Sequence, residues 1–275
     1  MNEENPEINE PDEEKWEAPP LPEEIEAEKQ EEPEMSEVAT LGNIFFEPGR
    51  TFEDLRRKPR FLIAFVILAA ISLGFLVAFQ QKMGDERIRR FITSQNEKST
   101  QFQSASPEQK KQAVDIGMMI QKVITYANPV LVALVLFLGG LIYWLGTKAM
   151  GGSARLAHGI SVFVYSSLPP GLVSVVANFI ILFLKAPDDI DIGASQRGLI
   201  NANPTMFFDG KDMPVLTTLI STIDIFAIWG LILAAIGLRK VAKISKGSAW
   251  AVVLILTLIG ITARVIGAYF NGVPS

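Results

Sequence analysis

The sequence predicts an all-α, polytopic membrane protein with five transmembrane helices and short amphipathic helices between them. The first observation is residues 61–79, nineteen consecutive positions without a charged side chain. A bilayer core about 30 Å thick requires roughly 20 apolar residues for one helical crossing. The second observation is that four further runs of this kind follow along the chain. Because a helix satisfies its backbone hydrogen bonds internally, each run is expected to cross the lipid as a helix.

The charge of the chain is divided between two unlike parts. Residues 1–40 contain sixteen acidic and two basic residues, six prolines and one aromatic residue, whereas residues 41–275 carry a net charge of +9. A segment so poor in apolar side chains cannot offset the entropy lost on ordering. Residues 1–40 are therefore predicted to be a disordered, acidic, proline-rich tail, and residues 41–275 the membrane domain. The tail either captures a basic partner or is simply a solvated segment.

The predicted spans cover residues 60–80, 129–150, 160–184, 217–238 and 249–270. Basic residues gather before the first span and in the short loops after the second and fourth spans, whereas the loop after the third is acidic. The positive-inside rule then predicts a cytoplasmic N-terminus and an external C-terminus. The loop between the first two spans opposes this orientation with eight basic residues, but its length of nearly fifty residues weakens its influence.

Two segments outside the spans carry helix-start signals. Thr51 precedes a carboxylate three residues on, Asp54, which is close to the capping-box pattern. The apolar and basic residues around it suit a short helix lying in the cytoplasmic interface. Ser106 is followed by Pro107 and Gln109, a hydroxyl cap with proline at the first helical position. This second signal predicts an amphipathic helix that packs on the membrane or on the bundle.

Ionisable residues within predicted spans are expensive to bury and need an explanation. Asp224 lies seven residues, about 10 Å, from the outer end of the fourth span, and Arg264 lies six residues, about 9 Å, from that of the fifth. Asn178 in the third span reaches the same level. We expect an ion pair between Asp224 and Arg264, with Asn178 as a third member. The cluster either fastens the helices together or forms a polar site of a small transporter or permease.

The third span carries Pro169 and Pro170 at its middle. Proline removes a backbone donor and clashes with the preceding turn, so a kink or a helix break is predicted here. Broken helices line substrate sites in some transporters, and kinks also arise from plain packing.

Signatures of enzymes are missing from the sequence: it has no G-x-S-x-G, no H-E-x-x-H and no phosphate-binding Gly-Lys loop. We therefore predict a non-enzymatic protein with no catalytic residue, cofactor site or metal site. The adjacent acids Asp188, Asp189 and Asp191 would be the ligands if the chain were a metal-dependent membrane enzyme, but such loop acids are more often solvated. The basic residues lie beside apolar spans, where anionic lipid heads explain them better than nucleic acid does.

The order of several short motifs resembles that of the Yip family, the Ypt/Rab-interacting multi-pass membrane proteins, in its bacterial-type branch. The segment before the first span has the family's spacing of proline, phenylalanine, leucine and proline at Pro48, Phe52, Leu55 and Pro59. The third span carries a similar Tyr-Ser-x-x-Pro stretch with Tyr165, Ser166 and Pro169. The last two spans and their basic loop are also similar, so the resemblance covers about residues 41–270.

The resemblance implies five spans, a cytoplasmic N-terminus, the bacterial cytoplasmic membrane as location, and a role in membrane organisation or trafficking with partners docking on the cytoplasmic side. The implied partners are the lipid bilayer and other membrane or cytoplasmic proteins, a second copy of the chain among them. Eukaryotic members carry an Asp-Leu-Tyr-Gly-Pro motif near the second span, where this chain reads YANPVLVALVL. Binding of small GTPases is therefore not carried over.

Overall fold

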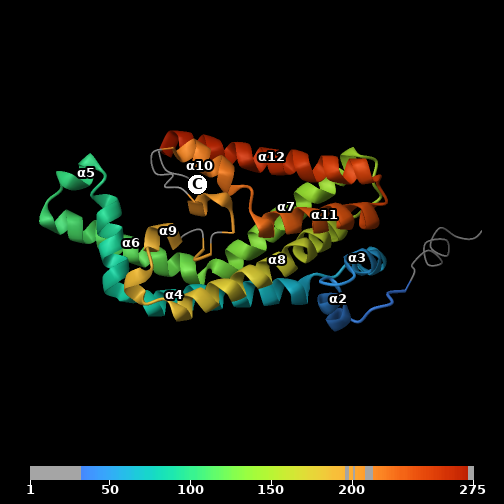
Figure 1. Ribbon diagram of the computed structural model, residues 1–275, viewed down its shortest axis with the longest axis horizontal. Helices are drawn as coiled ribbons and strands as arrows, with labels where there is room; N and C mark the ends of the chain where they lie inside the picture. The colour runs from blue at the N-terminus through green and yellow to red at the C-terminus, as the bar shows by residue number, and fades with distance from the viewer. Residues whose placement is uncertain (1–31, 196–197, 201, 208–212, 272–275) are drawn as a thin grey trace, which may run out of the picture. The chain divides into compact units, whose positions relative to one another are not determined.

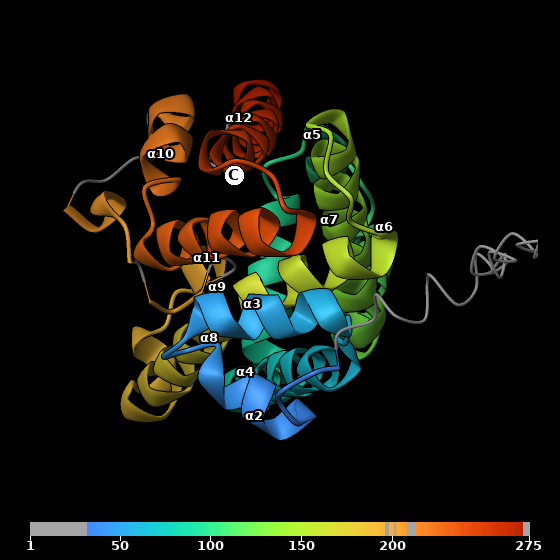
Figure 2. The ribbon, with the colours of Figure 1, turned by 90° about the vertical axis from the view of Figure 1, so that its right-hand side faces the viewer.

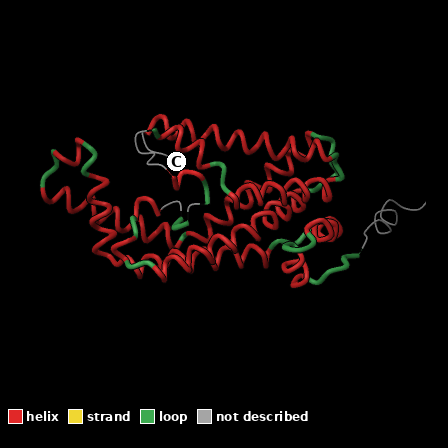
Figure 3. Tube along the Cα trace, viewed as in Figure 1, coloured by secondary structure: helices red, strands yellow, loops and turns green. Residues whose placement is uncertain are grey.

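The computed structural model describes residues 32–195, 198–200, 202–207 and 213–271, and all regular elements in this part of the chain are helical (Figures 1 and 3). Five of these helices are long and apolar enough to cross a membrane. The predicted fold class is thus confirmed. The elements are α2 (Glu37–Asn43), α3 (Pro48–Arg57), α4 (Leu62–Asn96), α5 (Thr100–Gln103), α6 (Pro107–Tyr126), α7 (Asn128–Ala149), α8 (Leu156–Leu184), η1 (Pro187–Asp189), α9 (Ile192–Ser195), η2 (Pro204–Phe207), α10 (Pro214–Ser221), α11 (Ile225–Ala242) and α12 (Lys246–Asn271).

Three of the five long helices follow the predicted spans closely. The helices α7, α8 and α12 differ from the predicted ranges by a few residues at most, as helix ends commonly do. The first helix, α4, starts at the predicted place but continues through the expected loop to Asn96. It bends at Gly84, whose φ of 72° and ψ of 157° are not helical. Glycine tolerates a positive φ because it has no Cβ, so it permits a bend within one helix.

The predicted fourth span is wrong in its first third. Residues 214–221 form the separate helix α10, and α11 begins only at Ile225. Asp224 is the N-cap of α11, and its carboxylate oxygen accepts hydrogen bonds from the backbone of Phe226 and Ala227 at 2.9 and 3.1 Å. Free amides at a helix start favour such a carboxylate, so the break falls immediately before this residue.

Of the two alternatives predicted at Pro169 and Pro170, the helix break is wrong, because α8 continues through both prolines from Leu156 to Leu184, and the kink stays a prediction. Both proline rings are buried. Neighbouring helices allow proline within a span by packing around the freed backbone groups. The helix α11 packs here, since a Cβ built on Gly230 would be in ordinary contact with the carbonyl oxygen of Ser166 at 3.6 Å and with Pro170 Cγ at 3.7 Å.

The helix α2 crosses the boundary expected at residue 41, since it covers Glu37–Asn43 within the compact unit of residues 33–275. Ser36 caps α2 by accepting a hydrogen bond from Ala39 N at 3.2 Å. The part of the predicted tail up to residue 31 lies outside the described residues.

The helix α3 starts three residues before the predicted Thr51 cap. Pro48 occupies its first turn, where the missing amide hydrogen costs nothing, and the Thr51 hydroxyl instead donates to Glu47 O at 3.0 Å. Its apolar residues Phe52 and Leu55 are fully buried among the long helices. The expected interfacial helix, with an apolar face toward lipid, is therefore a helix packed on the protein.

One hydrophobic core joins α3 to the long helices, and a second, smaller cluster holds α4, α6 and the end of α8 together. Figure 1 shows α2 and α3 at one end of the long helices and α5 with α6 beyond the other end. The capping box predicted for α6 is present, with the Ser106 hydroxyl accepting from Gln109 N and the Gln109 side chain accepting from Ser106 N.

Candidate functional site

Three segments that are distant in sequence meet at the end of the bundle beneath α2 and α3. The backbone of Ser153, between α7 and α8, donates to Ala242 O in α11 at 3.3 Å. His158 of α8 lies 3.0 Å from Arg56 O in α3 through its Nε2 atom. We call this region the basic end, because it collects the cations Arg56, Arg57, Lys58, Lys148, Arg155, Arg239, Lys240, Lys243 and Lys246.

The motif residues of α3 form the contact between the basic end and the spans. Phe52 and Leu55 are both 0% exposed and share a core with Tyr165 and Val162 of α8. Gly237 of α11 makes room for this contact, since a Cβ built on it would lie 2.8 Å from both Phe52 Cε1 and Val162 Cγ1. Figure 2 shows α3 beside α11 and in front of α8, and α3 contacts both helices.

Two other motif residues, Pro59 and Ser166, influence or bind the main chain. Pro59 follows Lys58, whose φ of −134° and ψ of 100° are extended, as is usual before proline. The turn ends α3 and leads into α4. Ser166 is buried in α8, where its hydroxyl donates to Phe163 O at 3.0 Å. The motif is thus a structural one, which places a short helix on the bundle.

A buried carboxylate holds the N-terminal segment against α3. Asp54 is 1% exposed and forms an ion pair with Arg60, which is only 10% exposed. The same carboxylate accepts hydrogen bonds from Glu34 N at 2.6 Å and Met35 N at 3.1 Å. Buried charges are tolerated when they are paired and hydrogen-bonded in this way. One side chain therefore fixes the chain before α2, the helix α3 and the start of α4 to one another.

Two further contacts connect α3 to the spans. Lys240 of α11 forms an ion pair with Glu53 of α3. The hydrogen bond from Lys240 lowers the pKa of the Glu53 carboxyl below its ordinary value of 4.5. His158 receives a hydrogen bond from Arg155 N at 3.1 Å on Nδ1, so Nε2 carries the proton and donates to Arg56 O.

Sequence reasoning missed these charged residues. The sequence pattern suggests only a capping role for Asp54, although this carboxylate lies on the same helical turn as the apolar motif residues Phe52 and Leu55. A charge on a predicted apolar face indicates that it is paired, but the sequence does not say with which residue. In the sequence alone, Arg60 and Lys240 contribute only to the positive charge from which the orientation is predicted.

The predicted polar cluster is not assembled among the described residues. Asp224 caps α11, and Arg264 of α12 has its Nη2 atom 3.4 Å from the hydroxyl of Ser221 in α10. Asn178 is buried in α8, where its side-chain oxygen accepts from the backbone of Leu199 and Ile200 and its amide donates to Ser174 O at 2.8 Å. Asp224 Oδ1 accepts from the first amides of its own helix, and no ion pair joins Asp224 to Arg264 among the described residues.

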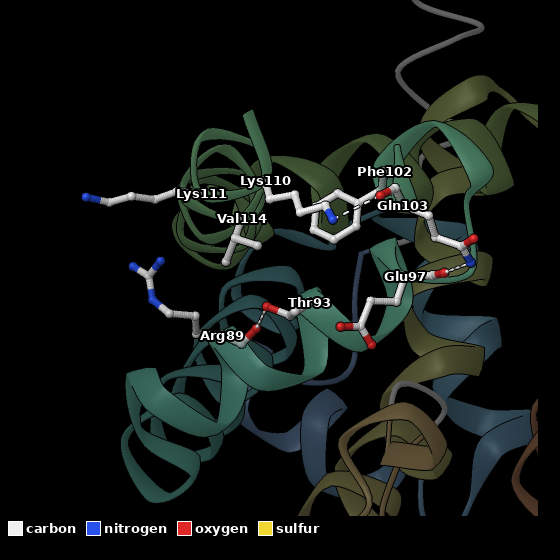
Figure 4. A pocket seen from close by; sticks show the side chains of 8 residues that line it. All are labelled: Arg89, Thr93, Glu97, Phe102, Gln103, Lys110, Lys111 and Val114. Atoms are coloured by element: carbon white, nitrogen blue, oxygen red, sulfur yellow. Dashed lines mark hydrogen bonds between the residues drawn. The ribbon is translucent and has the colours of Figure 1, made fainter. Parts of the chain in front are cut away.

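An open groove lies beyond the other end of the spans. It has a volume of about 760 Å³ and is lined by α4, α5 and α6, with Arg89 and Glu97 on one side and Lys110 and Lys111 on the other (Figure 4). Lys110 Nζ donates to Gln103 O at 3.0 Å and lies 5.9 Å from the centre of the Phe102 ring. Because both positively and negatively charged side chains line this open groove, its charge favours neither an anionic nor a cationic ligand.

The described residues contain no group of three or more histidine, aspartate or glutamate side chains that could hold a metal ion. Asp188 is used instead in an ion pair with Arg87, and Asp191 accepts from Gly193 N at 2.8 Å. The best-built polar arrangement in this part of the chain is therefore the one at the basic end. Its chemistry is that of attachment, since Asp54, Glu53 and His158 each bind a group from another segment of the fold.

Comparison with known proteins gives one family and one curated relative. The model of the Yip1 domain matches residues 42–266. The protein named Membrane protein YknW of Bacillus subtilis (strain 168) is 28% identical over 241 residues, which cover 86% of this chain and 94% of the relative. None of the solved structures matches the chain.

Proposed function

The chain belongs to the Yip1 domain family, and from this premise we propose that it is a non-enzymatic organising protein of the membrane, whose protein partners dock on α2 and α3 at a cytoplasmic basic end. One observation carries the proposal. A helix pair outside the spans is held rigidly on them by the buried contacts of Phe52, Leu55 and Asp54. A folded attachment of this kind offers partners a surface of fixed shape without the cost of ordering it on binding.

The distribution of charge supports a cytoplasmic location for the basic end. The cations there stand in short segments beside the spans, which are the positions that the positive-inside rule counts. Four basic residues at the opposite end have partners within the protein: Lys82 with the carbonyl oxygens of Leu182 and Phe183, Arg87 with Asp188, Arg89 with Asp115, and Lys122 with Asp85. These four cations, half of the eight in the loop that opposes this orientation, therefore have a role in folding.

The surface of α2 and the turn after it has the character of a docking site. Val38 is 75% exposed and Phe46 is 85% exposed, although both stand outside the candidate spans. The same segment also exposes charged side chains, among them the ion pair of Arg50 with Glu34. Exposed apolar side chains accompanied by charged ones are typical of protein interfaces.

The proposal is tested by crosslinking from single cysteines, because the chain has no cysteine of its own. Val38→Cys and Phe46→Cys place a photoreactive maleimide on the proposed surface, and Ser104→Cys places it at the opposite end. In membrane vesicles from the native host we expect adducts with another protein, or with a second copy of the chain, at the first two positions only.

Two background variants sharpen the experiment. Asp54→Ala releases the α2–α3 attachment and is expected to abolish the adducts, whereas Glu47→Ala removes only an exposed ion pair and is expected to retain them. Adducts at Ser104→Cys alone, or no adducts at any position, would contradict the proposed docking surface.

A further inference from the structure

A partly enclosed cavity of about 300 Å³ lies on the inner side of the bend in α4. Its walls are mostly apolar and include Phe75 and Phe79 before the bend and Ile88 and Phe91 after it. The helices α6 and α9 close its other sides. This size is at the lower limit of ordinary ligand pockets, which are concave, largely apolar and carry few polar groups.

The backbone at Gly84 produces this cavity. Its positive φ changes the direction of α4 between the two pairs of wall residues. On a straight helix of 3.6 residues per turn, Ile88 and Phe91 would lie on nearly the opposite face from Phe75 and Phe79. The change of direction at Gly84 lets both pairs line one space. The second hydrophobic cluster, with Met83 and Met118 at its centre, packs around the bend but does not fill that space.

The position of the cavity along α4 corresponds to the edge of the hydrocarbon layer. Counting from Leu62, Phe75 lies about 20 Å along the helix and Gln80 about 27 Å, compared with a core thickness of about 30 Å. The walls before the bend are therefore at the depth of lipid tails, and the walls after it are at the depth of the headgroups. Lipid tails therefore surround the helix at the depth of the walls before the bend.

Two amide side chains accompany the apolar walls. Gln80 donates through Nε2 to the hydroxyl of Thr125 at 2.6 Å, which fixes it between α4 and α6. Gln121 lines the cavity and is also exposed, so it stands at the opening. An amide at that depth can donate a hydrogen bond to the ester carbonyl of a lipid.

We propose that this cavity binds the hydrocarbon tail of one membrane lipid, with the glycerol ester region at Gln121. Water is a poor occupant of a space walled by phenylalanine and isoleucine, because it finds too few hydrogen-bond partners there. A lipid tail matches the walls, is abundant at this depth, and exchanges from the surrounding layer. The bend at Gly84 then has a role, which is to open a tail-sized space at the membrane edge.

The test uses the full-length chain in nanodiscs that contain phosphatidylglycerol with a diazirine near the end of one acyl chain. After illumination, crosslinked peptides are mapped by mass spectrometry. We expect adducts on residues 75–80 and 88–92 to be enriched over adducts on the exposed face of α7, where Val130 and Leu134 report ordinary lipid contact. If the cavity holds water, or if its walls meet only the surrounding lipid, both regions should be labelled equally. Equal labelling would therefore overturn the proposal.

A matched pair of variants separates the cavity from the general lipid surface. Leu76→Trp fills the cavity from its wall, and Val77→Trp adds the same side chain at the next position, which does not line the cavity. Enrichment is expected to be lost in the first variant and kept in the second. If Leu76→Trp is not monodisperse, the smaller Leu76→Phe replaces it. Unchanged enrichment of adducts in whichever of these variants is folded would refute the binding of a lipid tail in this cavity.

Discussion

Removing the carboxylate of Asp54 is the sharpest perturbation of the α2–α3 attachment. In Asp54→Ala, Arg60 stays 90% buried without its counter-ion, and its Nε atom already has no hydrogen-bond partner within the described residues. The amides of Glu34 and Met35 lose their acceptor as well. Breaking a buried ion pair by removing one partner costs about 3–5 kcal/mol, and we expect a loss of unfolding free energy in that range.

The double variant Asp54→Ala with Arg60→Met tests the reasoning behind this magnitude. It removes the stranded charge and leaves only the two amides without their acceptor, so we expect a cost of about 1–3 kcal/mol, less than that of the single variant. The assay is denaturant unfolding of the purified protein in detergent, with Glu47→Ala as the exposed-pair control at about 0–1 kcal/mol. A single variant no worse than this control, or a double variant worse than the single one, would refute the buried-pair argument.

Three further predictions concern other contacts of the bundle. Gly237→Ala brings a Cβ to 2.8 Å from Phe52 and Val162, and this overpacking should lower the free energy of unfolding by about 1–3 kcal/mol in thermal unfolding. The control Gly260→Ala has nothing within 4 Å of its Cβ and should leave the stability unchanged. Lys240 lowers the pKa of Glu53 in the folded state. The stabilisation from this carboxylate is therefore fully present above the unfolded pKa near 4.5 and is lost as the pH falls through the lower folded pKa. In a profile of unfolding free energy against pH, Glu53→Gln should remove this contribution on the acid side. Asp224→Ala should cost about 1 kcal/mol through loss of the α11 cap, and Asp224→Asn should recover most of it in the same unfolding assay; equal losses would contradict the capping role.

The sequence predicts the long helices well because their signal is local. A run of apolar residues long enough to cross lipid marks a span wherever it stands, and the cap at Ser106 is likewise contained in four consecutive residues. The motif around Phe52 and Leu55 also indicated a helix, although its start at Pro48 and its inward packing required the surrounding spans.

The errors concern residues whose surroundings come from distant segments. Hydropathy averages over windows, so it could not detect that one carboxylate, Asp224, starts a new helix within an apolar run. The two prolines in α8 predict a kink or a break, but the helix continues through them where both rings are buried against segments distant in the sequence. The pairing of Asp54 with Arg60 is local, yet its burial depends on α8 and α11.

The most direct measurement is the sidedness of single cysteines in intact cells, made possible by a chain without native cysteine. Ser153→Cys and Ser245→Cys lie in exposed loops at the basic end, and Ser99→Cys lies between α4 and α5 at the opposite end. A membrane-impermeant maleimide should label Ser99→Cys in intact cells and the other two only after permeabilisation. Labelling of Ser153→Cys or Ser245→Cys in intact cells would contradict five crossings with a cytoplasmic basic end.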